Sequence, residues 1–415
     1  MTIRVVDALC GAGKTTWCFD YMNKNSLLEK WIFVSPYLGE VGDGEVSGRI
    51  QKDLPSMKFV SPKTAPNKKE SFKRAVENGR NIAITHKLFT GFTQEVADLI
   101  KEQSYNLVID ETIDLINFYD DIPKDDVKLL IRAGMIFVGD KGILHWNNDE
   151  FSNYKGRDSD IKDLCDNGCL WLYGEDVLIQ RIPPACIQAC KTVTIMTYLF
   201  EGSLMHSWLK LNNIEWESYD PPSLKSAKEL KDSIREKIHL VKPPKFINDL
   251  QVKRDGSPRD GAFNMTWYRD TDIETMTEVR KSVESTIKYN MVKGEIFWTC
   301  FKAWKPVLEG VGYTRSKRVP WLDEPRPTFL SKNTRASNEY RDCTKCVYMV
   351  NIYPNGSLET HLAHHDIVID RDLYALSEIV QFIFRGCIRC NEEMDLYILS
   401  NRMRRIFEEW LMTDK

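Results

Sequence analysis

The sequence predicts an α/β protein in which parallel sheets are flanked by helices. Three observations predict this class. A short apolar strand at residues 3–6 runs directly into a glycine-rich loop and then a helix. Residues 1 to about 120 alternate short β-rich runs with amphipathic helical stretches, as parallel βαβ units do. A second region with the same alternation begins near residue 272 and continues toward the C-terminus.

The expected elements follow from these patterns. In the first half we expect strands at residues 3–6, 31–34, 81–86, 106–112 and 192–197, and helices at 15–23, 68–78 and 93–103. In the second half we expect strands at 295–299, 346–352 and 395–399, and helices at 272–289, 375–389 and 401–411. The polar, irregular stretch at about 120–185 is interpreted as an accessory insertion. The predicted domains are therefore residues 1–215, including this insertion, and residues 216–415.

Length and composition describe an ordinary globular chain. Its 415 residues exceed one typical core, so two domains or more are expected. The net charge of −3 gives no overall basic signature, and a nucleic-acid surface would have to be a local stripe of Lys and Arg. We expect neither a membrane span nor a signal peptide, since no long apolar run is present and the first strand begins at once. Eleven cysteines then indicate free thiols in a reducing, cytoplasmic compartment.

Residues 8–16, Ala-Leu-Cys-Gly-Ala-Gly-Lys-Thr-Thr, have the composition of a phosphate-binding loop. The backbone N–H groups of such a loop point at a phosphate chain, and Lys14 can reach the β and γ phosphates. The Thr15 hydroxyl stands where Mg²⁺ is held, and the following helix adds the positive end of its dipole. The sequence therefore predicts a site for ATP and Mg²⁺, with contacts from Gly11, Ala12, Gly13, Lys14, Thr15 and Thr16.

One position departs from the strict loop pattern G-x-x-x-x-G-K-[ST]. Ala8 stands where that pattern has its first glycine. The departure matters little if Gly11 and Gly13 form the turn. The alternative is a chance glycine-rich turn, which the strand before and the helix after argue against.

The apolar run at residues 106–109 ends in Asp110 and Glu111. A carboxylate at the end of a strand beside the phosphate loop can hold Mg²⁺, and a second can polarise the attacking water. We assign Asp110 to the first role and Glu111 to the second. Alone, such a pair could be a helix cap, but with the Gly-Lys-Thr loop upstream it indicates NTP hydrolysis.

The predicted helix at residues 375–389 places Gln381, Arg385 and Arg389 four residues apart, on one helix face. Two arginines on a rigid helix suit the charge of a transferring γ-phosphoryl group. The alternative is a solvated arginine face.

Two cysteine pairs have the spacing C-x₂-C, which can indicate zinc. One pair leads into a predicted strand and the other lies in or beside the predicted arginine helix, whereas zinc ligands usually occupy tight loops. Free core thiols are therefore expected at these positions, which are Cys343, Cys346, Cys387 and Cys390.

The phosphate loop, the Asp-Glu strand end and the arginine set together resemble motifs I, II and VI of superfamily 2 helicases. The helicase motifs that lie between motifs I, II and VI also have similar segments in this chain. In order, these are residues 34–36, Thr85 with His86, 195–197, 296–299 and 333–338. In its motifs and their order, the sequence resembles the compact DEAD/DEAH-like helicases of tailed bacteriophages. The resemblance covers nearly the whole chain apart from residues 120–185.

This resemblance implies two RecA-like domains with ATP in the cleft between them, and an ATPase that moves along or unwinds nucleic acid, DNA rather than RNA. It implies that Thr197 couples hydrolysis to movement, and that Arg335 and Asn338 touch the nucleotide and the strand. It also implies work in phage replication or recombination with a protein partner. The upstream glutamine element that reads adenine is absent, because only seven residues precede Ala8. Base selectivity is therefore left open.

Two rival functions remain. A DNA-packaging ATPase of the large-terminase kind would share the loop and the Asp-Glu strand, and would need a metal-dependent nuclease near the C-terminus. Asp366, Asp370 and Asp372 are the acids available for that nuclease. The other rival is a non-catalytic nucleic-acid binding protein that uses nucleotide as a clamp, which the intact Lys14 and Glu111 argue against.

Overall fold

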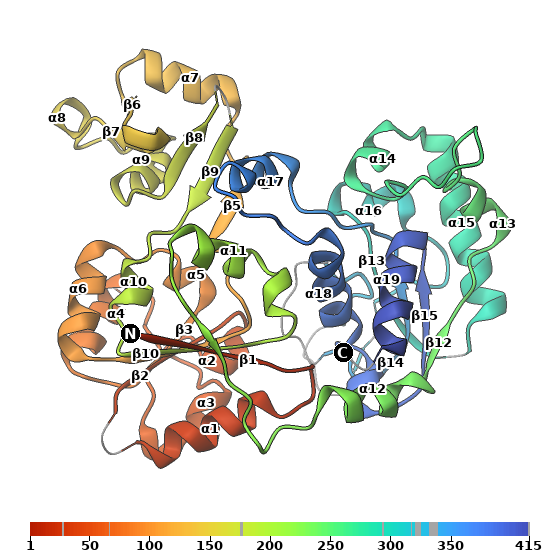
Figure 1. Ribbon diagram of the computed structural model, residues 1–415, viewed down its shortest axis with the longest axis horizontal. Coiled ribbons are helices and arrows are strands. Elements are labelled where there is room, and N and C mark those ends of the chain that lie inside the picture. The colour runs from red at the N-terminus through yellow and green to blue at the C-terminus, as the bar shows by residue number, and fades with distance from the viewer. Residues whose placement is uncertain are drawn as a thin grey trace. The chain divides into compact units, whose positions relative to one another are not determined.

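The computed structural model describes residues 1–413, apart from residues 27, 28, 66, 175, 176, 293, 317, 320–324 and 332–338. The chain divides into two compact units. Figure 1 shows the chain coloured by residue number from the N-terminus to the C-terminus. The first unit comprises Met1–Asp7, Lys14–Ser223 and Pro354–Ile369, and the second comprises Ala8–Gly13, Leu224–Tyr353 and Asp370–Lys415. Each unit contains a parallel sheet flanked by helices, so the predicted α/β class is confirmed.

The first unit is built on a six-stranded sheet in the order β11-β1-β10-β4-β2-β3. All its pairings are parallel. Every residue of β2 and β4 is buried, as expected for parallel strands covered on both faces. The strands are β1 (Thr2–Asp7), β2 (Trp31–Ser35), β3 (Ile82–Thr85), β4 (Asn106–Asp110), β10 (Thr192–Thr197) and β11 (Glu217–Ser218).

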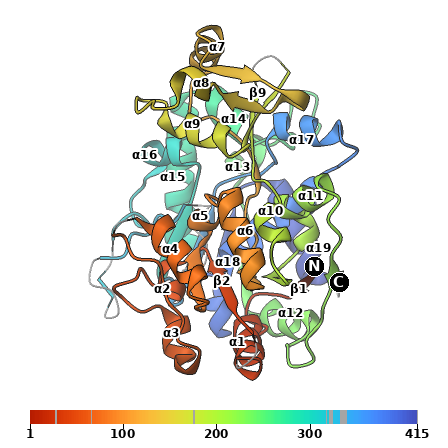
Figure 2. The same ribbon diagram turned by 90° about the vertical axis from the view of Figure 1, so that its left-hand side faces the viewer.

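Several helices of the first unit begin at polar caps. The side chain of Asn67 caps α4, and that of Thr93 caps α6, by accepting backbone N–H groups. The two helices lie side by side, with the rings of Phe72 and Phe92 4.3 Å apart (Figure 2). The helices are α1 (Lys14–Lys24), α2 (Leu38–Val41), α3 (Arg49–Asp53), α4 (Lys68–Glu77), α5 (His86–Phe89), α6 (Gln94–Gln103), α10 (Ala185–Gln188), α11 (Leu204–Leu211) and α17 (Gly356–Ala363), with 3₁₀ turns at η1 (Pro55–Met57) and η3 (Phe200–Gly202).

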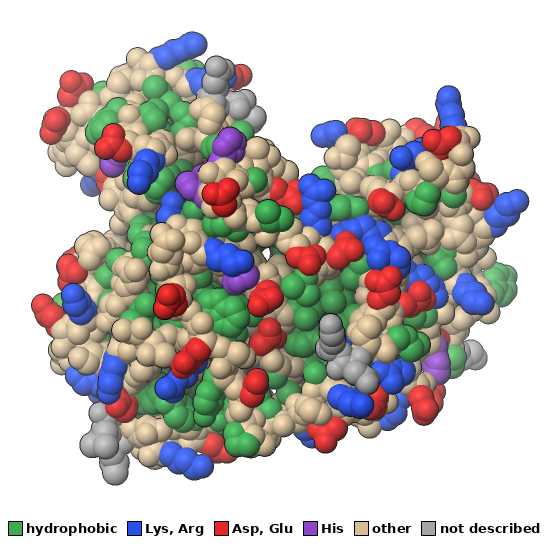
Figure 3. All heavy atoms as spheres, viewed as in Figure 1, with side chains coloured by type: hydrophobic (Ala, Val, Ile, Leu, Met, Phe, Trp, Pro, Cys, Tyr) green, Lys and Arg blue, Asp and Glu red, His purple; other side chains and the backbone are tan. Residues whose placement is uncertain are grey.

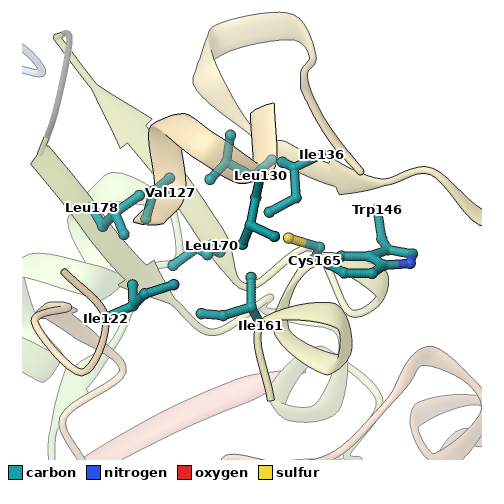
Figure 4. Packing of buried hydrophobic residues seen from close by; sticks show 10 residues of the cluster. Ile122, Val127, Leu130, Ile136, Trp146, Ile161, Cys165, Leu170 and Leu178 are labelled. Carbon is teal, nitrogen blue, oxygen red and sulfur yellow. The ribbon is translucent and has the colours of Figure 1, made fainter. Parts of the chain in front are cut away.

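The predicted insertion is an ordered subdomain with its own hydrophobic core. Figure 4 shows this core, in which Leu144 and Leu170 are fully buried and Trp146 covers one side. It consists of an antiparallel sheet in the order β5-β9-β8 and a hairpin of β6 and β7. Its elements are β5 (Ile116–Phe118), α7 (Lys124–Arg132), β6 (Ile136–Val138), η2 (Asp140–Gly142), β7 (Leu144–Trp146), α8 (Asn148–Phe151), α9 (Ser159–Asp166), β8 (Leu170–Tyr173) and β9 (Val177–Arg181).

The second unit contains a four-stranded parallel sheet in the order β12-β15-β14-β13. Its strands are β12 (Ile238–Leu240), β13 (Glu295–Thr299), β14 (Cys343–Tyr348) and β15 (Met394–Ile398). The surrounding helices are α12 (Ala227–Arg235), α13 (Lys245–Asp249), α14 (Met265–Asp270), α15 (Ile273–Asn290), α16 (Lys305–Leu308), α18 (Arg371–Ile383) and α19 (Asn401–Met412), with 3₁₀ turns η4 (Lys302–Trp304) and η5 (Cys387–Cys390).

One strand of the second unit is displaced from its predicted position. We expected residues 346–352, whereas β14 begins at Cys343 and ends at Tyr348. The buried apolar residues at the start of this strand are Cys343 and Cys346. Because cysteine is not one of the β-branched residues typical of strands, the start of the strand was placed too late. In the part of the chain that the structure describes, no helix is both long and apolar enough to cross a bilayer.

Candidate functional site

Four neighbouring strands of the first unit end in polar residues at the same edge of the sheet. The register pairs Asp7 at the end of β1 with Thr197 at the end of β10, and pairs Met196 with Asp110 at the end of β4. Ser35 ends β2, the next strand along. Ligands of open α/β sheets bind outside the carboxyl ends of the strands. The sheet order therefore brings the predicted Asp110 and Thr197 to one candidate site, together with Asp7 and Ser35.

The loop between β1 and α1 has the backbone of a tight glycine turn. Gly11 and Gly13 have φ angles of +87° and +98°, in the left-handed region that disfavours side chains. The Ala12 N–H donates to the carbonyl oxygen of Leu9 over 3.1 Å. The turn therefore depends on these two glycines, as the sequence predicts, and Ala8 does not prevent it. Helix α1 begins at Lys14, whose side chain is buried.

Asp110 is held from two sides at the end of β4. The Ser35 hydroxyl donates a hydrogen bond to Asp110 Oδ2 over 3.3 Å. His86, the first residue of α5, places its Nε2 atom 2.9 Å from the Asp110 carbonyl oxygen, to which it donates. Both contacting residues lie in segments that resemble helicase motifs. Ser35 fixes one carboxylate oxygen of Asp110, and His86 fixes its backbone.

Burial, followed by the neighbouring carboxylates of Glu111 and Glu40, raises the pKa of Asp110 to about 7. The ammonium of Lys14 and the Ser35 hydroxyl act in the opposite direction. A buried carboxylate among other carboxylates is costly to ionise unless a cation lies beside it. This donor set fits Mg²⁺, which prefers one or two carboxylates and hydroxyl or water ligands.

Glu111 adopts a strained backbone directly after β4. Its φ angle is +64°, and its N–H donates to the carbonyl oxygen of Met196 over 2.9 Å. Its Oε2 atom is buried and finds no hydrogen-bond partner among the described residues, and the same holds for Oγ1 of Thr197. Left-handed non-glycine residues and unsatisfied buried polar atoms both occur preferentially at functional sites. Such atoms are suited to bind a water molecule or a ligand.

Two acidic residues near this site were not predicted. Asp7 accepts hydrogen bonds from the N–H groups of Leu199 and Phe200 over 2.7 and 2.8 Å, so it fixes the loop that follows β10. Glu40 lies on the four-residue helix α2, is buried, and has the Arg49 guanidinium 3.5 Å away. No periodic pattern marks so short a helix, so Glu40 could not be identified from the sequence.

The prediction of one helix over residues 375–389 is wrong at its C-terminal end. Helix α18 ends at Ile383, so it contains Gln381, but Arg385 follows it and Arg389 lies in the separate turn η5. The three side chains therefore do not share one helix face. The chain turns at Gly386, where a Cβ atom would lie 2.3 Å from Met394 Cε and 2.8 Å from Phe297 Cε1. Only glycine permits this close return onto the sheet.

The two arginines have different surroundings within the second unit. Arg385 is 5% exposed, and its guanidinium lies 5.3 Å from the ring centre of Phe382. Arg389 is exposed. The predicted nucleic-acid contacts Arg335 and Asn338 lie outside the described residues.

Two of the three acids proposed for a nuclease, Asp370 and Asp372, have structural roles. Asp370 caps α18 by accepting the N–H groups of Asp372 and Leu373. Asp372 pairs with Arg402 over 2.8 Å and with Arg405 over 3.2 Å. Within the described ranges, no three His, Cys, Asp or Glu side chains are grouped so that they could hold a metal ion.

The cysteine pairs lie on two different kinds of element. Cys343 and Cys346 lie on β14, and Cys387 and Cys390 are the first and last residues of η5. Burial raises the pKa of Cys343 and of Cys387 to about 12. Both groups are therefore thiols rather than thiolates at neutral pH.

The comparisons with known proteins follow the same division of the chain. Residues 116–180 match the family model described as the YonV middle domain, and residues 232–411 match the YonV C-terminal Rossmann-like domain. The SPbeta prophage-derived uncharacterized protein YonV of Bacillus subtilis (strain 168) is 29% identical over 433 residues, covering 99% of this chain and 98% of that one. The chain is thus similar to this protein over nearly its full length. The middle-domain match coincides with the subdomain from β5 to β9.

The fold of the chain is also similar to that of a solved structure. S. tokodaii Xpd4 has a TM-score of 0.50 and 14% identity, covering 100% of this chain and 94% of that one. At this identity the likeness concerns the fold. It agrees with the Rossmann-like match and with the prediction of two RecA-like domains.

Proposed function

We propose that this chain is an ATP-dependent nucleic-acid translocase or helicase. The observation that carries the proposal is the meeting of Lys14, Asp110 and Glu111 at one sheet edge. These are the groups that hold a triphosphate, its metal and the attacking water in P-loop ATPases. The resemblance to superfamily 2 helicases supports the assignment. The relative described above is prophage-derived, which supports a phage origin for this chain.

In the proposed reaction Lys14 and the N–H groups of the glycine loop hold the β and γ phosphates. Thr15 and Asp110 would hold Mg²⁺, which supplies positive charge to neutralise the phosphates when bound. Glu111 orients water for in-line attack, because its buried Oε2 atom is available to accept a proton or hydrogen bond. Arg385 or Arg389 supplies further positive charge to the γ-phosphoryl group.

A basic hollow in the first unit supports nucleic-acid binding. A cavity of about 720 Å³ is lined by Lys68, Lys69 and Lys73 of α4 and by Lys87 of α5, together with the acidic Glu70 of α4. Lys73 pairs with Glu95, which leaves an excess of positive charge. Elsewhere, on the face shown in Figure 3, Lys and Arg side chains are interspersed with Asp and Glu. A local basic region of this kind is what a chain of net charge −3 would need to bind phosphates.

Paired variants separate binding from hydrolysis. We expect Lys14→Ala to lose nucleotide binding and turnover together, since it removes the phosphate ligand. Glu111→Gln should keep ATP affinity while turnover falls by about 10²- to 10⁴-fold, the usual effect of losing a general base. Steady-state hydrolysis and equilibrium ATP binding measure the two quantities. If Glu111→Gln hydrolyses ATP like the wild type, the proposed role of Glu111 is wrong.

A further inference from the structure

An aromatic cluster lies along the outer edge of β1 in the first unit. The rings of Trp17 and Tyr21, four residues apart on α1, stack with their centres 5.7 Å apart and an interplanar angle of 15°. Tyr219, directly after β11, places its ring 5.7 Å from that of Trp17. Tyr21 in turn packs edge-on against the buried Trp31. The cluster is thus anchored in the core at one end.

The other end of the cluster is open to solvent. Tyr219 is 37% exposed and Trp17 is half-buried. The side of α1 that packs on the sheet is formed by Cys18, Phe19 and Met22, so Trp17 lies outside the core. Figure 1 shows α1 running along the sheet beside β1. Aromatic rings that are held in place yet partly exposed are suited to stack on a flat ligand.

The ring of Tyr219 is held in position by its neighbours. Its N–H donates to the carbonyl oxygen of Val5 over 2.8 Å, which continues the pairing of β11 with β1. The Arg4 guanidinium lies 5.6 Å from the ring centre and pairs with Glu217 over 3.2 Å. Tyr219 is therefore fixed near the carboxyl end of β1, where the phosphate loop begins.

The sheet order decides which way a nucleotide must point. Asp110 lies on β4, two strands from β1 on one side, whereas β11 and Tyr219 lie on the other side of β1. A triphosphate whose γ-phosphate end faces Asp110 directs its base away from β4, toward β11. Trp17 lies two residues after Thr15, about 3 Å farther along the helix axis at 1.5 Å per residue.

We propose that Trp17 and Tyr219 form the wall on which the base of the bound nucleoside triphosphate stacks, an inference that rests on the nucleotide site proposed above. Every base has a π face, so stacking alone discriminates weakly between bases. ATP and GTP should therefore bind with affinities within a few-fold of one another. The wall formed by Trp17 and Tyr219 would hold the base, which is part of what an upstream adenine-reading element does in other helicases.

The test compares nucleotides with inorganic tripolyphosphate, which has no base, using the full chain and Mg²⁺. Trp17→Ala and Tyr219→Ala should each weaken ATP and GTP binding by about 5- to 100-fold, the range of base–aromatic stacking. Tripolyphosphate affinity should not change. Trp17→Phe should restore most of the ATP affinity. Tyr289→Ala, at a 71% exposed ring in the second unit, is the matched control and should match the wild type.

Three outcomes overturn the stacking inference. The first is ATP binding by both alanine variants that equals wild type. The second is an equal loss for ATP and tripolyphosphate, which would reveal a structural effect only. The third is a preference of wild type for one purine of more than 100-fold. If wild type binds neither ATP nor tripolyphosphate, the proposed function itself fails.

Discussion

The Ser35 hydroxyl donates a hydrogen bond to Asp110 Oδ2 over 3.3 Å, joining the ends of two adjacent parallel strands. Both side chains are buried. The hydrogen bond holds one oxygen of Asp110 in a fixed direction, and it favours the ionised carboxylate. Ser35 thus orients the carboxylate that we propose as a ligand of Mg²⁺.

Removing this hydroxyl should weaken the binding of Mg²⁺ with nucleotide. Residues that orient a metal ligand typically contribute about 10- to 100-fold in metal affinity or activity. We expect Ser35→Ala to raise the Mg²⁺ concentration needed for half-maximal ATP hydrolysis by that factor, and Ser35→Thr to restore part of it. Ser233→Ala removes a hydroxyl bonded to Leu230 on α12 and serves as the control. An unchanged Mg²⁺ requirement in Ser35→Ala would contradict this role.

The raised pKa of Asp110 predicts a pH-dependent stability. The folded-state pKa of about 7 lies above the ordinary value of 3.8. Between these pH values the folded protein holds a proton that the unfolded chain has lost, so this group lowers the free energy of unfolding as pH rises from about 4 to about 7. Without Mg²⁺, Asp110→Asn should therefore gain more thermal stability over wild type at pH 8 than at pH 5.

Calorimetry of the two proteins at both pH values checks this prediction. Asp120→Asn, at an exposed position, should show no pH-dependent gain. If Asp110→Asn unfolds at a lower temperature than wild type at pH 8, the carboxylate is not the destabilising group described.

The two arginines of the second unit should respond differently to truncation. An arginine that reaches the γ-phosphate contributes about 10³- to 10⁵-fold to turnover. We expect such a loss in Arg385→Ala or Arg389→Ala, with ATP affinity nearly unchanged. Arg385→Ala should also lower the thermal midpoint, because Arg385 is buried, whereas Arg389→Ala should not. Turnover rates and thermal unfolding of both variants test the assignment, and full activity in both would refute it.

The lysine-lined hollow should contribute to nucleic-acid affinity in a salt-dependent way. Lys69 and Lys87 are both exposed there. Replacing both by Glu should weaken single-stranded DNA binding and reduce the slope of log K against log salt by about 0.7 per lost phosphate contact. Fluorescence anisotropy over a salt series measures both. The matched double variant Lys128→Glu, Lys155→Glu changes the charge equally on the middle subdomain. Equal binding by the two double variants would exclude the hollow as a DNA surface.

The middle subdomain should unfold without disturbing the nucleotide site. Leu170 is fully buried in the separate core, and truncating such a leucine costs about 2–5 kcal/mol. Leu170→Ala should increase hydrogen exchange in residues 116–181, while ATP binding stays at the wild-type level. Leu129→Ala, at a 62% exposed position of the same subdomain, is the control and should change little. Loss of ATP binding in Leu170→Ala would show that the subdomain supports the site.

The sequence predicted best where strands are long, buried and followed by distinctive residues. The strands ending at Asp110 and Thr197 were located because parallel strands are continuously apolar. The insertion could not be resolved into elements, since its strands span three to five residues and carry no clear period. The helix carrying Gln381 was extended too far because the apolar spacing continues past Gly386, where the fold imposes a turn.

The rate of ATP hydrolysis by the wild-type chain, measured with and without single-stranded DNA, tests the central claim most directly. We predict Mg²⁺-dependent turnover that rises when DNA is added and that disappears in Lys14→Ala. Absence of turnover both with and without DNA, in a folded protein, would contradict the claim.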